Sequence, residues 1–355
     1  MTGVRARGER VRQFILDRVE QSPNGVAQAV GEKFGISRQA ANIHLRRLCD
    51  EGILERSGRT RATRYRLAAL SRWSRRYKLR TEQAEDVVWA RDVRGVLGEF
   101  PENAMTIWHY GFTEMFNNAI DHSEAGTVVV SVARTAVNTE MTISDDGCGI
   151  FRKIQRALGL LDERHSVLEL SKGKLTTDPQ YHTGEGIFFT SRMFDGFEIL
   201  SGDIYFAHEF GSAEDWILER NGGSAGTTVM MKLDNRTTRI AREIFDEYAS
   251  EDDFGFTKTV VPVRMARYGE DQLISRSQAK RLLARVELFE TVLFDFREVE
   301  TVGPAFIDEM FRVFAMRHPE IELAAVNTNP AIDRTIERAR ANLKVLQTRL
   351  QEEAS

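Results

Sequence analysis

The chain has 355 residues, of which 42% are hydrophobic, so it can bury more than one core and is expected to form two or three domains. Its mean hydropathy is −0.36, and no apolar run approaches the roughly 20 residues of a membrane-spanning helix, which argues against a membrane-embedded protein. The two cysteines, Cys49 and Cys148, lack metal-ligand spacing, and the first residues lack the apolar segment of a secretory signal. We therefore expect a cytoplasmic protein with no membrane partner.

The charge is distributed unevenly along the chain. Residues 1–80 carry 19 Lys and Arg against 7 Asp and Glu, a net charge of +12, whereas the remainder carries 30 against 46, a net charge of −16. This asymmetry predicts that the first 80 residues, and not the others, contact a polyanion such as double-stranded DNA.

The basic segment has the pattern of a helix-turn-helix. Apolar residues at helical spacing predict a helix over residues 8–21, and GVAQAVGEKFG predicts a second helix that ends at Gly35. Ser37 is a suitable N-cap for a third helix. We expect the inward face of that helix to contain Ala40, Ile43, Leu45 and Leu48. With ILERSGRTRATRYRL as two strands around a basic loop, these 65 or so residues resemble the winged helix-turn-helix of bacterial transcription regulators.

In such a domain the early residues of the third helix face the major groove of DNA. Arginine can read guanine, and glutamine or asparagine can read adenine, through paired hydrogen bonds. The expected base-reading residues are Arg38, Gln39 and Asn42. The expected phosphate contacts are Arg46, Arg47, Arg59, Arg61 and Arg64. The alternative is a solvated basic surface on a protein-interaction domain of the same fold.

Residues 71–100 predict a mostly helical connector, and residues 102–123 predict a helix with a polar stripe. Glu114, Asn118 and Asp121 fall at i, i+4 and i+7, so their side chains share one face of that helix. Carboxylates and amides are costly to bury without a partner. The stripe therefore indicates either a ligand site or a solvated helix face.

Three further motifs follow this helix. A strand runs into DDGCGI, a helix begins within HTGEG, and the strand GTTVMMKL has threonines at its entrance. Each motif is common alone, because Asp-Gly and glycine pairs are frequent in turns. Their fixed order after the polar helix favours a nucleotide site. The residues that they single out are Asp145, Gly147, Gly149, Gly184, Gly186 and Thr227.

Together these motifs make residues 101–235 resemble the Bergerat-fold (GHKL) ATP-binding domain shared by gyrase, the large heat-shock chaperone, histidine kinases and mismatch-repair ATPases. TEMFNNAIDHS and GEGIFFTSRMFDGFEI are most similar to the anti-sigma-factor serine kinases. The resemblance implies an α/β sandwich that binds ATP and Mg²⁺. No phosphoacceptor histidine in a helical hairpin is apparent before this domain, which disfavours histidine-kinase chemistry.

The resemblance implies roles for the carboxylates and the amide. Glu114 would polarise the attacking water or hydroxyl, Asn118 would bind Mg²⁺, and Asp121 would line the pocket wall. Asp145 would accept a proton from the adenine amino group, which distinguishes adenine from guanine because guanine presents a carbonyl there.

The resemblance also implies roles for the glycines and the threonine. Gly147 and Gly149 would let the backbone approach the base and the lid. Gly184 and Gly186 would present backbone amides to the phosphates. Thr227 would help to fix adenine.

The interval from Gly149 to Gly184 would form an ATP lid, longer than in the small anti-sigma kinases. Lys172 and Lys174 are candidates to reach phosphate, and a solvated lysine pair is the alternative.

The C-terminal part alternates strand and helix, which predicts an α/β layer. FDFREVETVGPAF resembles the core of STAS domains that act as anti-sigma-factor antagonists, in which a serine at a helix start is phosphorylated. Thr301 would stand at the acceptor position. The alternative is that Thr301 caps the helix that begins near Gly303 and Pro304.

The sequence thus predicts a multi-domain α+β protein. The expected parts are a winged helix (1–70), a helical connector (71–100), an ATP-binding domain (101–235), a linker helix (236–253) and a STAS-like domain (254–355). The expected function is that of an ATP-responsive, DNA-binding transcription regulator with slow ATPase activity, acting as a homodimer and contacting a protein partner through the STAS-like domain. The alternatives are a serine/threonine kinase that acts on Thr301 or on a separate STAS partner, and a scaffold that binds nucleotide without turnover.

Overall fold

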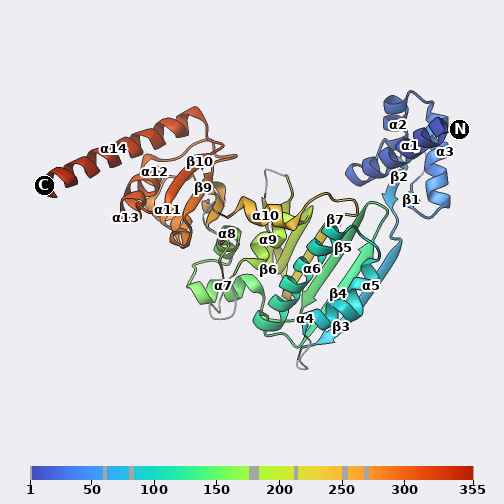
Figure 1. Ribbon diagram of the computed structural model, residues 1–355, viewed down its shortest axis with the longest axis horizontal. Helices are drawn as coiled ribbons and strands as arrows, with labels where there is room; N and C mark the ends of the chain where they lie inside the picture. Colours follow the sequence, from blue (N-terminus) through green and yellow to red (C-terminus); the bar gives the residue numbers. More distant parts are fainter. Residues whose placement is uncertain are drawn as a thin grey trace.

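The computed structural model describes residues 2–58, 62–79, 84–175, 184–211, 215–249, 255–267 and 272–354. Over these ranges the chain is a mixed α/β protein of several domains, arranged in chain order from the blue N-terminal helices to the red C-terminal helix (Figure 1). Among the helices so described, none is both long and apolar enough to cross a membrane.

The N-terminal domain consists of three helices and a hairpin around its own core. Ile15, Val30 and Leu45 are fully buried in that core. The third helix begins as predicted, because the Ser37 hydroxyl accepts a hydrogen bond from the Ala40 amide at 3.2 Å. The elements are α1 (Thr2–Gln21), α2 (Val26–Phe34), α3 (Arg38–Asp50), β1 (Leu54–Ser57) and β2 (Arg64–Leu67).

The predicted inward face of α3 is wrong at two positions. The buried residues are Ala41, Leu45 and Leu48, at i, i+4 and i+7. Ala40 is only partly buried, and the Ile43 side chain is 65% exposed. Ile43 is out of phase with the buried stripe, so it projects into solvent among the predicted DNA-contacting side chains.

The central domain is a five-stranded antiparallel sheet, in the order β3-β4-β5-β7-β6, with helices on one face (Figure 1). Alternate strand residues such as Val128, Val130 and Val132 are buried beneath those helices. The strands are β3 (Ser71–Lys78), β4 (Thr127–Arg134), β5 (Asn138–Asp145), β6 (Gly196–Glu209) and β7 (Asp215–Asp234). The helices are α4 (Glu85–Val88), η2 (Trp89–Val93), α5 (Arg94–Leu97), α6 (Glu102–Asn117), η3 (Asn118–His122), α7 (Ile150–Leu158), α8 (Arg164–Lys172), α9 (Gly186–Met193) and α10 (Ala241–Glu247).

Two predicted connecting helices are corrected by the structure. Residues 71–78 form strand β3, which pairs with β4 from Ser71↔Arg134 to Lys78↔Thr127, and helix begins only at Glu85. The pattern is hard to recognise because β3 is an edge strand in which Tyr77 alone is buried. The linker helix predicted over 236–253 is limited to α10, with non-helical residues before it and residues 250–254 outside the described part.

The C-terminal domain has a three-stranded parallel sheet in the order β10-β9-β8, with helices packed on it, as the alternating pattern predicts. Phe294, Phe306 and Phe311 are buried between these layers. The elements are β8 (Lys258–Pro262), η4 (Val263–Ala266), α11 (Arg276–Leu283), η5 (Val286–Leu288), β9 (Thr291–Asp295), α12 (Pro304–Asp308), η6 (Glu309–Phe314), α13 (Ala315–Arg317), β10 (Glu322–Val326) and α14 (Pro330–Ala354).

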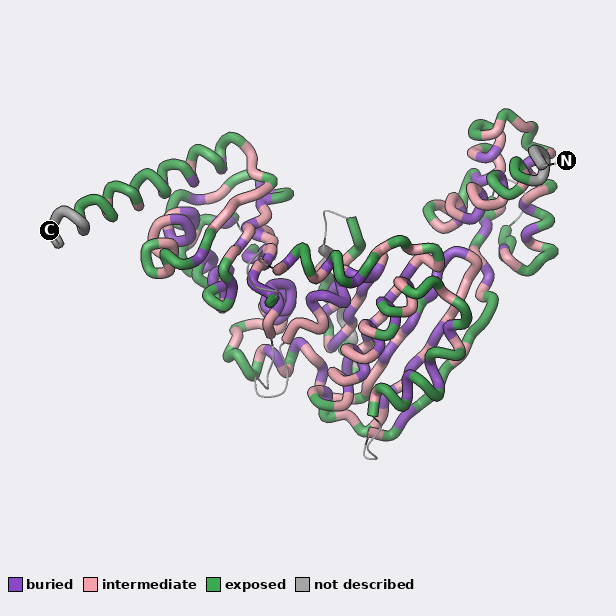
Figure 2. The backbone as a smooth tube through the Cα atoms, viewed as in Figure 1, coloured by how far each residue is buried: buried purple, intermediate pink, exposed green. Residues whose placement is uncertain are grey.

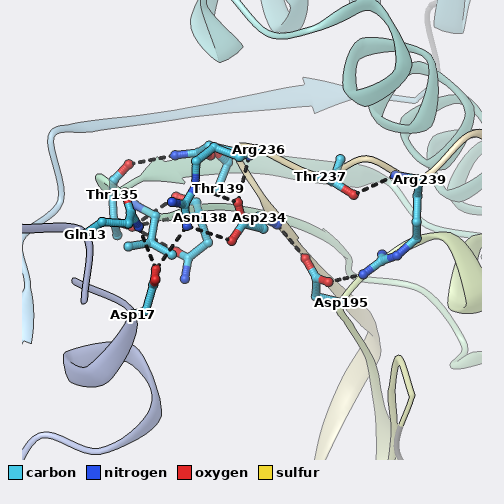
Figure 3. Close-up of polar contacts among 12 residues, drawn as sticks. Gln13, Asp17, Thr135, Asn138, Thr139, Asp195, Asp234, Arg236, Thr237 and Arg239 are labelled. Carbon is cyan, nitrogen blue, oxygen red and sulfur yellow. Dashed lines mark hydrogen bonds and ion pairs between the residues drawn. The ribbon is translucent and has the colours of Figure 1, made fainter. Parts of the chain in front are cut away.

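The two domain junctions differ in kind. The central and C-terminal domains share one continuous hydrophobic core, whereas the N-terminal domain has a separate core. The N-terminal domain meets the central domain mainly through polar contacts of α1, where Asp17 accepts from Arg236 at 3.0 Å and Glu20 pairs with Lys232 (Figure 3 shows the Asp17 contact). Val137, in the β4–β5 turn, adds an apolar contact because it packs into the N-terminal core.

Candidate functional site

A cavity of about 280 Å³ lies where the polar end of α6 meets the carboxyl end of β5. It is walled by side chains and glycines from segments far apart in the sequence. Six of the eleven residues predicted to serve ATP line it, namely Glu114, Asn118, Asp145, Gly184, Gly186 and Thr227. A cavity with polar groups converging from several segments is the usual form of a ligand site.

The predicted polar stripe on α6 is only partly preserved. Glu114 lies in the α-helix, whereas Asn118 begins the π-helical turn η3, and both line the cavity. A π-turn closes with i→i+5 hydrogen bonds, so it rotates later residues away from the α-helical phase. Asp121, three residues further, is exposed and does not line the cavity. The prediction that Asp121, at i+7, shares the face of Glu114 and Asn118 is therefore wrong.

Gly186 fixes the position of the Glu114 carboxylate. A Cβ atom on Gly186 would overlap with Glu114 Oε2, so the carboxylate packs directly against the start of α9. Gly184 has a φ of +75°, and its carbonyl accepts from the Leu175 amide at 3.0 Å. These contacts close the chain around one side of the cavity.

The adjacent carboxylates Asp145 and Asp146 have opposite environments. Asp145 Oδ1 accepts from the amides of Gly147, at 2.9 Å, and Thr227, at 3.2 Å, but burial still raises the pKa of this carboxyl above its ordinary value. Asp146 is exposed, and the hydrogen bonds that it accepts from Thr127 and Gly126 lower its pKa. Asp145 thus faces the cavity, while Asp146 anchors the start of β4.

Gly147 and Gly149 do not line the cavity, but each allows neighbouring segments beside the cavity to pack closely. A Cβ on Gly147 would overlap with the Ser123 carbonyl, and Gly149, with a φ of +85°, would bring a Cβ within 2.8 Å of Ser201 Oγ. The Thr227 hydroxyl accepts from the Ile150 amide at 2.9 Å, which holds the start of α7 against β7.

The sequence reasoning missed Lys153, a cation in the cavity wall. Its ammonium donates to the His122 carbonyl at 2.6 Å and pairs with Glu124 at 3.5 Å. The available signal was its spacing, because Lys153 lies one helical turn after Gly149 at the start of α7. His122 and Ser123, at the end of η3, also line the cavity.

The two lysines proposed to reach phosphate instead contact the C-terminal domain. Lys172 is completely buried, and its ammonium pairs with Glu169 at 2.7 Å and donates to the Ala284 carbonyl at 2.7 Å. The Lys174 ammonium donates to the Leu288 carbonyl at 2.9 Å. Neither lysine lines the cavity, so both the phosphate-ligand and the solvated-pair interpretations fail for Lys172.

No cluster of three or more His, Cys, Asp or Glu side chains arranged to hold a metal occurs among the residues described. The cavity does contain the Asn118 amide and the Glu114 carboxylate, which are hard oxygen donors. Mg²⁺ commonly takes one or two protein ligands and completes its shell with phosphate oxygens and water. The donor set therefore fits a magnesium ion that arrives with a phosphate ligand.

A second candidate surface lies on α3 of the N-terminal domain. Arg38, Gln39 and Arg46 are exposed, and Asn42 is partly buried. Arg47 is also exposed, but its guanidinium pairs with Glu51 at 2.9 Å, which offsets part of its charge. Of the predicted loop arginines, Arg64 is exposed on β2 and Arg59 and Arg61 fall outside the described residues. The described members of the two sets of predicted DNA contacts thus lie on α3 and on strand β2 of the hairpin.

Comparison with known proteins bears on the C-terminal domain. Residues 278–333 match the family described as a STAS-like domain of unknown function (DUF4325). The C-terminal domain is STAS-like. No curated protein matches the chain.

Within the STAS-like domain, Thr301 is exposed in the loop before α12. The helix N-cap is Gly303, with Pro304 as the first helical residue, so Thr301 does not cap the helix. Thr301 is an exposed residue, and the N-cap interpretation is wrong.

Proposed function

We propose that this protein is an ATP-binding, ATP-responsive, DNA-binding transcription regulator with slow ATPase activity. The observation that carries the proposal is the cavity that gathers Glu114, Asn118, Asp145 and Thr227 with the glycines Gly184 and Gly186. These residues come from four motifs that the sequence alone associates with a Bergerat-type nucleotide site. Their convergence on one cavity supports the association, because unrelated turn motifs would have no reason to meet.

The cavity residues suit the parts of ATP in different ways. Asp145 is an acceptor for the adenine amino group, and the Gly147 and Thr227 amides that donate to its Oδ1 orient the carboxylate. Asn118 supplies an amide oxygen for Mg²⁺, which would neutralise phosphate charge and bridge the phosphate oxygens. Glu114, held against Gly186, is placed to orient and polarise a water near the γ-phosphate.

The N-terminal domain is proposed to bind double-stranded DNA as a winged helix. A capped third helix with Arg38, Gln39 and Arg46 on its exposed face supports this role. Exposed Ile43 adds an apolar group that suits the thymine methyl. Two copies that read paired half-sites would act as a homodimer.

The test is a thermal shift of the full chain with ATP or GTP in the presence of Mg²⁺, followed by duplex-binding titrations with and without ATP. We expect a shift with ATP that exceeds the shift with GTP, and DNA affinity that depends on ATP in the wild type but not in Asn118→Ala. A protein that is not stabilised by millimolar ATP lacks the proposed site. DNA affinity that is the same with and without ATP would exclude the regulatory switch.

The second candidate function is a serine/threonine kinase. The exposed position of Thr301 in the STAS-like domain favours it. Transfer would join the γ-phosphorus to the threonine oxygen, release ADP and leave the hydroxyl proton with a base such as Glu114. Incubation with γ-labelled ATP separates the two functions, because protein-bound label that is absent in Thr301→Val supports the kinase, whereas free phosphate alone supports the ATPase.

A further inference from the structure

Helix α8 is buried around its whole circumference, although its sequence contains charges. Every residue from Ser166 to Lys172 is buried, including the charged Glu169, which is 3% exposed, and Lys172 itself. A helix is buried on all sides only when something covers each face. Leu170 on α8 forms part of the cavity lining, and Lys172 on the same helix contacts the C-terminal domain. Figure 2 shows α8 as a buried (purple) helix between the central sheet and the C-terminal domain.

A buried ionic network joins α8 to the STAS-like domain. The Lys172 ammonium contacts Glu169, and it also donates to the carbonyls of Ala284, at 2.7 Å, and Arg281, at 3.3 Å. The other oxygen of Glu169 accepts from Arg285 at 3.2 Å. Partial separation would leave buried charges unpaired, so the network favours the docked arrangement over a partly opened one.

The three residues after α8 connect this network to the cavity. Arg285 donates to the Lys174 carbonyl, and the Lys174 ammonium lies 4.9 Å from the centre of the Phe289 ring. The next residue, Leu175, lines the cavity and donates its amide to Gly184, another lining residue. One short segment therefore has a cavity contact at one end and STAS-like domain contacts at the other.

Helix α9 makes a second, apolar connection. It begins at Gly186 in the cavity, and its Phe188 and Phe189 rings pack on Phe256 with centroid distances of 4.5 and 4.9 Å. Phe256 in turn packs on Phe289 at 5.2 Å. No comparable core contact reaches the N-terminal domain from the described cavity residues, because that domain has its own core.

We propose that docking of the STAS-like domain on α8 and ATP binding in the cavity stabilise each other, so that this domain is the element that reports occupancy of the cavity. The inference rests on the proposed nucleotide site. Its physical basis is that α8 and the segment through Leu175 are at once the cavity wall and the docking surface. Undocking removes the support of Leu170 and Leu175, so it lowers ATP affinity. By linkage, bound ATP must then favour the docked state to the same extent.

Arg285→Met tests the coupling, because Arg285 touches the docking surface but not the cavity. Arg312→Met is a matched control, since Arg312 has a similar exposure (22% against 20%) and pairs with Asp308 inside the STAS-like domain. Calorimetric titration of the full chain with ATP and Mg²⁺ should give a Kd at least about fivefold higher for Arg285→Met, with Arg312→Met close to wild type. Arg285→Lys replaces Arg285→Met if the latter does not fold.

Hydrogen exchange of the wild-type chain provides an independent measurement. Added ATP should increase protection of the backbone amides in residues 281–289, which lie outside the cavity. Wild-type protein that does not bind ATP overturns the nucleotide site and the coupling together. Wild-type protein that binds ATP overturns only the coupling if the Kd of the Arg285 variant is unchanged or if residues 281–289 show no change in exchange.

Discussion

Replacement of Lys172 by methionine distinguishes a phosphate-binding lysine, as the sequence suggests, from the buried ion-pair partner that the structure shows. A lysine that binds phosphate would be lost with little effect on the unfolding free energy. In the structure the ammonium instead neutralises buried Glu169 and satisfies the carbonyls of Arg281 and Ala284. We therefore expect Lys172→Met to destabilise the free protein strongly.

The magnitude follows from what the substitution leaves behind. Glu169 keeps one ionic partner, Arg285, but loses its closest one, and two interior carbonyls lose a donor. Breaking a buried pair from one side costs about 3–5 kcal/mol, and each orphaned acceptor within that total costs about 1–3 kcal/mol. Because these terms overlap, we expect a loss of about 3–5 kcal/mol in the free energy of unfolding.

The assay is urea unfolding of the full chain followed by circular dichroism, with Lys280→Met as the control. Lys280 is a largely exposed lysine of the adjoining C-terminal domain that pairs with Glu309 at 3.9 Å, so its loss should cost less than about 1 kcal/mol. The double variant Glu169→Gln/Lys172→Met should recover part of the loss, because it removes the buried carboxylate that has lost its closest partner. If Lys172→Met costs no more than the control, the buried-network account is wrong.

Three further predictions concern the two candidate sites. Asp145→Asn should reduce the preference for ATP over GTP about tenfold or more, measured by titration, because a charged acceptor for the amino group is lost. Burial raises the pKa of Asp145, so the wild-type preference for ATP should fall on acidification at a higher pH than an ordinary aspartate would give. A preference that does not change with pH would contradict this. Gly186→Ala should lower ATP turnover about tenfold or more by displacing Glu114. The control Gly95→Ala, where a Cβ meets nothing within 4 Å, should leave turnover unchanged. Equal rates in both variants would argue against Glu114 as the group that positions water. Arg46→Ala should weaken binding to all duplexes and reduce by about one the slope of log affinity against log salt concentration. Ile43→Ala should instead change the sequence preference in a selection from random duplexes. Identical effects of the two variants would contradict the placement of α3 in the major groove.

Local patterns were sufficient to predict much of this protein. Ser37 marks the start of α3, and the alternation after residue 254 predicts the α/β layer of the STAS-like domain. These features are readable because capping and strand–helix alternation depend on residues close together in the chain. The motifs whose residues line the cavity were visible for the same reason, since each is a short pattern of its own.

The tertiary structure decided which charged residues serve the cavity. Lys172 and Lys174 look like solvent-facing lid lysines in the sequence, and only the approach of residues 281–289 determines that Lys172 is buried. The exposed position of Asp121 results from a π-turn that rotates it away from the cavity, and helical periodicity in the sequence does not reveal such a turn. β3 is a strand because β4 provides a partner edge, not because its arginine-rich sequence favours one. Local sequence therefore determined the elements and motifs, whereas burial by distant segments determined which side chains line the cavity and which join the domains.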